Sequence, residues 1–289
     1  MPVEPGLLPP RPPDAHKGDA GRVFVLAGSV GFSGAAALCT LGALRVGAGL
    51  VTLGLPKSLH GPMAEKLTEA MFKVLPETNA GSLSLAGLPE IVSAIEKMDA
   101  VAIGPGLSQH PQTKELVRQL LPKINKPLVL DADGLNAVAE DLAVLRKLLL
   151  PIIVTPHPGE MGRLIRQSAE EIQRDRERTA VSFAQQHRVV VVLKGHGTIV
   201  ANIDGSTYLN ETGNQGMASG GIGDVLTGMI AGLLAQKLSL FDAARLGVYL
   251  HGLAGDLAAA DRGQIGLLAS DLADRIPLAI RQYQQPVRG

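Results

Sequence analysis

Short apolar runs rich in β-branched residues recur along the chain and alternate with longer stretches of helical spacing. The runs are apolar on both faces, which is typical of strands that helices cover on both sides. They lie at residues 23–26, 50–53, 100–103, 128–130, 152–154 and 189–193. Helical spacing occupies residues 89–98, 113–121 and 168–187. This alternation predicts an α/β fold with a mostly parallel central sheet.

The pattern changes after the run at 189–193. Residues alternate in polarity around Asp204-Gly205, a dipeptide that favours a tight hairpin, so we expect an antiparallel edge there. Further helical stretches follow at 219–236, 240–260 and 268–283. No linker, repeat or heptad run interrupts the chain, so we expect one domain over residues 14–289, preceded by a proline-rich arm at residues 1–13.

Composition excludes several classes of function. The 27 Lys and Arg residues balance the 27 Asp and Glu residues, which disfavours a nucleic-acid-binding protein. The single cysteine, Cys39, cannot form an internal disulfide or a cysteine-based metal site, so a reducing cytoplasm is expected. Apolar stretches such as 225–235 are shorter than the ~20 residues that a membrane span needs. We therefore expect no membrane partner. The EEIQRDRER charges within 168–187 predict a solvated helix face.

Three of the predicted strands end in glycine-rich loops. These are AGSVGFSGA at 27–35, GPGLS at 104–108 and DADGLN at 131–136. Ligands of open parallel sheets bind beyond the carboxyl ends of the strands, and glycine lets a backbone approach a ligand closely. Each loop alone could be a simple tight turn, but three on one edge predict a pocket. Neither G-x-G-x-x-G nor G-x-x-x-x-G-K-[ST] occurs, which argues against Rossmann and P-loop sites.

The segment NQGMASGGIGDVLTG, residues 214–228, combines glycines with the start of a predicted helix. Ser219 is expected to cap that helix, and the glycines after it expose backbone N–H groups with partial positive charge. Asp224 would lie in the first turn and is expected to stay ionised at neutral pH. It could take a proton from a substrate hydroxyl while the N–H groups hold phosphate charge. The alternative is that Asp224 only complements the helix dipole.

Six motifs in order make a family resemblance specific. They are HKGDAGRVFVLAGSVGFSGAAAL (16–38), AIGPGL (102–107), VLDADGLNA (129–137), IVTPHPGEMGRL (153–164), VLKGHGT (192–198) and GGIGDVLTG (220–228). Together they closely resemble the ADP-dependent NAD(P)H-hydrate dehydratase family of the ribokinase-like superfamily. The resemblance implies a three-layer α/β/α sandwich. It also implies dehydration of the S epimer of hydrated NADH or NADPH through a phosphorylated intermediate, with ADP split to AMP and phosphate and with Mg²⁺ as cofactor.

The resemblance also implies the site residues. Asp224 would be the catalytic base, beside an anion hole formed by Gly220, Gly221, Ile222 and Gly223. The hydrated dinucleotide would contact Ala43, Gly106, His157 and Asp224. ADP or AMP would contact Lys194, Gly195, His196, Gly197, Thr198 and Gly223. Glu160 would bind Mg²⁺ through water. The other histidines lack metal-ligand spacing, so no transition-metal site is expected.

Taken without the resemblance, several of these residues have a simpler interpretation. Ala43 lies in a predicted helix and could be a packing residue, and Lys194 could be a solvated charge at a strand end. Glu160 could cap the helix that starts beside it. Asp131 and Asp133 could serve the same ion as Glu160.

The main rival is a ribokinase-like vitamin kinase, which would share the fold, the anion hole and Asp224. Such kinases usually carry T-P-N-x-x-E, whereas residues 155–160 read T-P-H-P-G-E, which favours the dehydratase. A non-enzymatic nucleotide sensor remains open because fold does not determine function. The resemblance further implies a homotetramer. The short segment before His16 has no room for an epimerase domain, so we expect a separate NAD(P)H-hydrate epimerase. The sequence does not distinguish NADH hydrate from NADPH hydrate.

Overall fold

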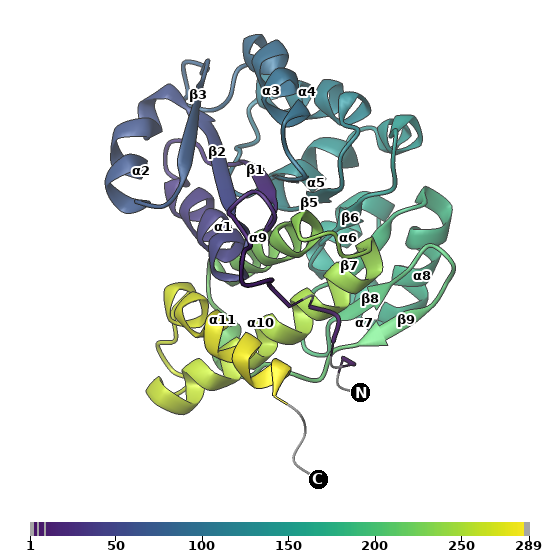
Figure 1. The fold of residues 1–289 in the computed structure, drawn as a ribbon. Coiled ribbons are helices and arrows are strands. Elements are labelled where there is room, and N and C mark those ends of the chain that lie inside the picture. Colours follow the sequence, from purple (N-terminus) through teal and green to yellow (C-terminus); the bar gives the residue numbers. More distant parts are fainter. Residues whose placement is uncertain (1–2, 5, 9, 286–289) are drawn as a thin grey trace.

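The computed structural model describes residues 3–4, 6–8 and 10–285, and within these ranges the strands form one sheet (Figure 1). Its strand order is β3-β2-β1-β4-β5-β6-β7-β8-β9. The strands are β1 (Arg22–Leu26), β2 (Leu50–Pro56), β3 (Met71–Leu75), β4 (Ala100–Ile103), β5 (Leu128–Leu130), β6 (Ile153–Val154), β7 (Val190–Leu193), β8 (Ile199–Ala201) and β9 (Thr207–Leu209). Neighbours from β3 to β7 pair parallel, and β8 and β9 add an antiparallel edge. The predicted mixed sheet is confirmed.

Helices connect and cover these strands (Figure 1). They are α1 (Ser33–Arg45), α2 (His60–Lys66), α3 (Leu88–Glu96), α4 (Pro111–Leu120), α5 (Ala132–Ala139), α6 (Pro158–Ile165), α7 (Ala169–Arg174), α8 (Arg176–His187), α9 (Ile222–Ala235), α10 (Leu240–Arg262) and α11 (Ala269–Gln284). None of the helices in the described ranges is long and apolar enough to cross a membrane.

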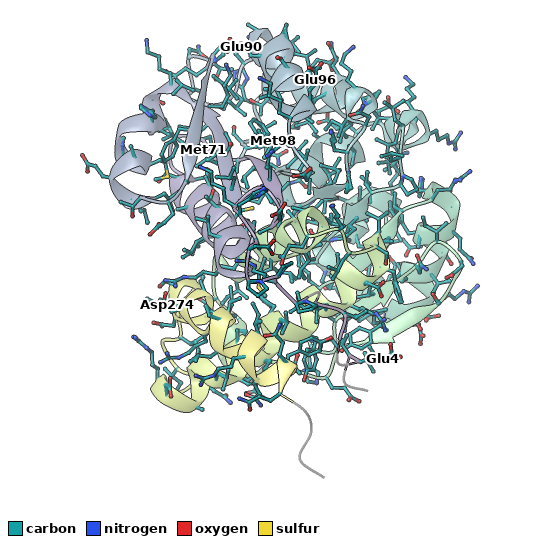
Figure 2. All side chains as sticks on the ribbon, in the orientation of Figure 1. Glu4, Met71, Glu90, Glu96, Met98 and Asp274 are labelled. Atoms are coloured by element: carbon teal, nitrogen blue, oxygen red, sulfur yellow. The ribbon has the colours of Figure 1, made fainter. Side chains whose placement is uncertain are left out.

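Alternate residues of each strand face opposite layers. Val23 and Val25 of β1 belong to a core cluster with α1, α9, α10 and α11, whereas Phe24 and Leu26 belong to a second cluster with α3 to α8. In Figure 2 the α3 residues Glu90 and Glu96 lie on the far side of the molecule from Asp274 of α11. The expected three-layer α/β/α sandwich is therefore confirmed, because both faces of the sheet are covered.

Small residues bring α1 and α9 into close contact above the sheet. A Cβ atom on Gly228 of α9 would lie 1.8 Å from the Cys39 carbonyl oxygen, and one on Gly42 of α1 would lie 2.3 Å from the Val225 carbonyl oxygen. Nearly every residue of α9 is buried. This packing places the first turn of α9 at the carboxyl ends of the strands, where the glycine-rich loops emerge.

Strand β3 and the break before α8 were not predicted. Strand β3 pairs only with β2, so its residues are half exposed and lack a continuous apolar pattern, with Met71 44% exposed (Figure 2). The single helix predicted over 168–187 is wrong, since it is divided at Asp175 into α7 and α8. The Asp175 side chain accepts a bond from the Arg178 N–H, and this cap starts a new helix.

The described part of the proline-rich arm packs onto the domain. Val3 and Leu8 are buried in the cluster that contains α10 and α11. The Leu7 N–H donates to the Tyr283 hydroxyl of α11 (3.3 Å), which itself donates to the Glu4 carbonyl oxygen. The arm is therefore attached to the core through Val3 and Leu8, whereas residues 10–13 are exposed, and positions 1–2, 5 and 9 of the predicted arm lie outside the described residues.

Candidate active site

The sheet reverses its strand order at β1, which lies between β2 and β4. Loops that leave neighbouring strands at such a point turn to opposite sides and open a crevice for ligands. Here they are the loops at 27–35 and 104–108, and they contact each other. The Ser29 hydroxyl donates to the Gly106 carbonyl oxygen (2.8 Å) and the Gly28 N–H donates to the Pro105 carbonyl oxygen (2.9 Å). The two loops that were predicted to line a pocket therefore lie side by side, and the pocket itself stays a prediction.

The third glycine loop joins the first two through Asp131. Gly104 has φ +135°, and a Cβ atom there would lie 1.7 Å from the Asp131 carbonyl oxygen. Only glycine allows that approach. The Asp131 N–H also donates to the Ile103 carbonyl oxygen (3.0 Å). All three loops therefore form one continuous surface at the carboxyl edge of the sheet.

Lys194, at the end of β7, points into this surface. Its Nζ lies 2.7 Å from Asp131 Oδ1 and 3.6 Å from Glu160 Oε2, and its side chain is only 18% exposed. Burial alone would lower the pKa of the Lys194 ammonium, but the charges of Asp131 and Glu160 outweigh burial and raise it. The Lys194 ammonium is thus a protonated, partly buried group that is paired with carboxylates. The simpler interpretation of Lys194 as a solvated charge at a strand end is wrong.

Helix α9 begins two residues later than expected. Its N-cap is Gly221 with φ +89°, so the prediction that Ser219 caps the helix is wrong. No side chain caps this end, and the N–H groups of the first turn lack acceptors within the helix. Nothing would contact a Cβ atom on Gly220, whereas Lys194 Nζ would lie 3.4 Å from one on Gly223. The glycines expected to form the anion hole thus lie at an open helix start beside the Lys194 side chain, and anion binding there stays a prediction.

His251 of α10 contacts the backbone at the start of α9. Its Nε2 lies 2.9 Å from the Ile222 carbonyl oxygen. Burial lowers the pKa of His251 to about 4, so the ring is neutral at pH 7, and Nε2–H must donate because a carbonyl oxygen only accepts. Sequence reasoning set this histidine aside because it has no metal-ligand spacing, and its role became visible only when α10 packed against α9.

Asp224, in the first turn of α9, has an unusual titration. Burial raises its pKa most, the charges of Asp131 and Glu160 raise it further and Lys194 lowers it, so that it lies at about 7. The expectation that Asp224 is simply ionised at neutral pH is therefore wrong, because burial and, after it, the neighbouring carboxylates disfavour the charged form. A carboxyl group that titrates near neutral pH suits a general base.

His157 and Glu160 start α6 together. His157 Nδ1 accepts from the N–H groups of Gly159 (3.0 Å) and Glu160 (3.3 Å), and Glu160 Oε2 accepts from the His157 N–H (2.8 Å). The capping interpretation of Glu160 is thus confirmed. Since Nδ1 accepts, the ring proton is on Nε2. Burial lowers the pKa of His157, and its side chain is still 49% exposed.

The carboxylates of this edge do not form a closed metal cage. Among the described residues no group of three or more His, Cys, Asp or Glu side chains is placed to hold an ion. Asp131 accepts from Lys194 and Thr227, and Asp133 accepts from the Ser108 N–H (2.9 Å). Mg²⁺ commonly keeps several waters and binds one carboxylate plus substrate phosphates. Asp131 and Asp133 are engaged, and Glu160 Oε2 accepts from the His157 N–H, so binding of Mg²⁺ by Glu160 through water stays a prediction.

The segment 194–198 is held from outside by a residue that the sequence analysis missed. Arg176, the first residue of α8, donates from Nη2 to the carbonyl oxygens of Leu193 (2.9 Å) and Lys194 (3.3 Å) and from Nη1 to that of His196. The prediction that the charged residues of EEIQRDRER (170–178) form a solvated helix face is wrong at Arg176. The only available signal was the capping type of residue before it, Asp175.

Two predicted substrate residues have contrasting positions. Gly106 lies at the crevice, where a Cβ atom would be 2.8 Å from the Phe32 carbonyl oxygen, so a larger residue would displace the first loop. Ala43 is fully buried between α1 and α9, beside Gly228 and Gly232. The structure therefore does not bring Ala43 to the crevice surface, and its substrate contact stays a prediction.

A family model and a curated relative point to the same family. The chain matches the Carb_kinase family, described as NAD(P)H-hydrate dehydratase, over residues 23–278. It is 48% identical over 280 residues to the bifunctional NAD(P)H-hydrate repair enzyme Nnr of Moorella thermoacetica, which is 97% of this chain and 53% of that one. This chain thus spans about half the length of that curated relative.

Solved structures agree with the sequence comparison. The ADP/ATP-dependent NAD(P)H-hydrate dehydratase of Bacillus subtilis, co-crystallised with ATP/Mg²⁺, is 34% identical with a TM-score of 0.81, covering 96% of this chain and 94% of that one. A ribokinase-like superfamily protein of Enterococcus faecalis is 28% identical with a TM-score of 0.80, covering 96% of this chain and 92% of that one. These neighbours confirm the ribokinase-like fold.

Proposed function

The chain belongs to the NAD(P)H-hydrate dehydratase family, and from this premise we propose that it dehydrates the S epimer of hydrated NADH or NADPH. ADP supplies the phosphoryl group and leaves as AMP, and the products are the intact dinucleotide and phosphate. One observation carries the proposal. Asp224, with a pKa of about 7, lies in the first turn of an uncapped helix beside the Lys194 cation.

The chemistry follows from the poor leaving ability of hydroxide. Asp224 takes the proton of the hydroxyl on the hydrated nicotinamide ring, and the hydroxyl oxygen attacks the terminal phosphorus of ADP. The bond between that phosphorus and the bridging oxygen breaks, and AMP leaves. The lone pair of the ring nitrogen then expels phosphate, a proton is lost, and the dihydropyridine is restored. The protein aligns the two reactants and neutralises charge.

Fixed positive charge at the start of α9 supports phosphoryl transfer there. The N–H groups of the first turn of α9 carry partial positive charge, and Lys194 adds a full one held by Asp131. Asp131 accepts from Lys194 and Thr227, so we assign it an orienting role. Glu160 would hold Mg²⁺ through water while the phosphates supply the other ligands, and the ion would neutralise phosphate charge.

The remaining assignments complete the proposal. Gly106 and His157 would contact the hydrated dinucleotide, and the backbone of residues 194–198 with Gly223 would contact ADP or AMP. We also propose cytoplasmic location, a homotetramer and a functional coupling to an NAD(P)H-hydrate epimerase. The relative from Moorella thermoacetica is named a bifunctional repair enzyme, which supports that coupling. Light scattering on the purified protein tests the tetramer.

We expect ADP to support higher turnover than ATP at matched Mg²⁺, because the six motifs resemble dehydratases that use ADP. The measurement follows the returning NADH absorbance from hydrated NADH, with phosphate release as a second readout. Equal or higher turnover with ATP would refute the donor preference. Mass spectrometry of the products separates the dehydratase from a vitamin kinase, since a kinase would accumulate a stable phosphoester of a pyrimidine or thiazole alcohol.

Replacing His157 by Ala should raise KM for the hydrate several-fold and leave the affinity for ADP nearly unchanged. Loss of one hydrogen bond costs about 0.5 to 1.5 kcal/mol. The same change removes the N-cap of α6, which costs about 1 kcal/mol of stability. His157→Asn keeps a capping side chain, so it should raise KM similarly while Tm stays unchanged. An unaltered KM in both variants would remove His157 from the substrate site.

A further inference from the structure

One guanidinium holds three carbonyl oxygens at the carboxyl end of β7. Arg176 donates to the oxygens of Leu193, Lys194 and His196 from the first residue of α8. Its Nε is buried and has no partner among the described residues. Burial lowers the pKa of Arg176, but an arginine in a protein keeps its proton, so a full positive charge remains partly desolvated at this loop.

These bonds determine where the N–H groups of the loop point. In a trans peptide the C=O group and the following N–H group point in opposite directions. Because the Lys194 and His196 oxygens face Arg176, the N–H groups of Gly195 and Gly197 face away from it. The Gly195 oxygen accepts from the Thr198 hydroxyl (3.0 Å). Within the described chain, no acceptor is found for the N–H groups of Gly195, His196 and Gly197.

The two glycines permit this arrangement. Gly195 has φ +142° and Gly197 has φ +62°, both in the region that L side chains rarely adopt. A Cβ atom on Gly195 would lie 3.0 Å from Arg176 Nη2 and would press on the guanidinium. Consecutive N–H groups in such a turn form a concave donor set that binds anions.

We propose that Arg176 is a positioning residue that orients the peptides of residues 194–197 so that their N–H groups are free to bind the nucleotide. This inference rests on the proposed function, which places ADP at this loop. Arg176 itself lies behind the loop and touches neither reactant. A lysine has one ammonium in place of the planar fork and cannot satisfy three carbonyl oxygens in the same way.

Calorimetric titration with ADP and Mg²⁺ tests the proposal. Arg176→Gln should weaken ADP binding by roughly tenfold or more, since several charge-assisted bonds are lost, and Arg176→Lys should be intermediate. KM for ADP should rise while KM for the hydrate stays unchanged. Arg178→Gln is the matched control, because Arg178 is an exposed arginine in the same helical turn, and it should bind ADP like the wild type.

Two further measurements separate a positioning role from a structural one. The Lys194 N–H donates to the Pro156 carbonyl oxygen (2.9 Å), and hydrogen exchange of this amide should accelerate in Arg176→Gln without ADP, while the rest of the sheet is unchanged. Millimolar guanidinium chloride should restore part of the ADP affinity of Arg176→Ala, and an equal concentration of urea should not. Arg176→Gln with wild-type ADP affinity and exchange would overturn the inference. Absence of ADP binding by the wild type would instead overturn the proposed function, and unchanged exchange would then also refute the role of Arg176.

Discussion

Asp224→Asn should lower turnover by roughly 100-fold or more while the affinity for ADP changes little, because the change removes the general base and keeps the shape of the side chain. The assay follows NADH that returns from its hydrate, and titration calorimetry measures ADP binding. Asp242→Asn is the matched control, because Asp242 also lies in the first turn of a helix. That helix, α10, starts near the C-terminal end of α9, away from Asp224. If Asp224 served only the helix dipole, both variants would behave alike.

The pH dependence gives this prediction a second readout. A base must be deprotonated to act, so kcat/KM of the wild type should rise as pH increases through about 7, the pKa of Asp224. Asp224→Asn should lose that ascending limb. Near-normal turnover in Asp224→Asn, or an unchanged ascending limb, would refute the assignment of the base.

Stability provides the check that the variant is folded. Folding raises the pKa of Asp224 from its ordinary value of 3.8 to about 7. The contribution of Asp224 to the free energy of unfolding is therefore fully present below pH 3.8 and is lost as the pH rises to about 7. At pH 8 the ionised carboxyl group is buried at a cost that asparagine avoids. Asp224→Asn should therefore have a Tm at pH 8 that equals or exceeds that of the wild type.

Gly228→Ala should destabilise the protein by about 3 kcal/mol, the upper end of the usual range for overpacking. The added Cβ atom would lie 1.8 Å from the Cys39 carbonyl oxygen, which is backbone and cannot turn away. Helices α1 and α9 would have to separate, and the first turn of α9 with Asp224 would shift with them. Denaturant unfolding measures the loss of stability, and turnover should fall in the same variant.

The control is another helical glycine. Gly61 of α2 is exposed, and nothing would contact a Cβ atom there. Gly61→Ala should change the stability by no more than ~1 kcal/mol in either direction, because alanine favours the helix whereas Pro62 after it disfavours helical backbone for a residue with a Cβ atom. Equal stability of the Gly228→Ala and Gly61→Ala variants would show that α1 and α9 have room to adjust. Close packing of α1 against α9 would then not be what positions the start of α9.

Local patterns in the sequence predicted most of the fold. The strand at 100–103 and the hairpin at Asp204-Gly205 were recognisable because side-chain period and turn chemistry are properties of neighbouring residues. The exposed edge strand β3 was missed because it is paired on one side only and needs no apolar pattern. The break at Asp175 was missed because helical spacing continues across it.

The residue types at the site can be read from the sequence alone: glycine loops at the strand ends, a carboxylate in the first turn of a helix, and a lysine after an apolar run. Tertiary structure alone decided how they act. Lys194 and Asp131 are 63 positions apart in the chain, yet they form an ion pair. The pKa of Asp224 depends on which charges surround it and how much water is excluded, and Arg176 became part of the site only when α8 packed beside β7. Charges and hydrogen bonds act through space, and the distances between them exist only after the sheet has brought its strand ends together.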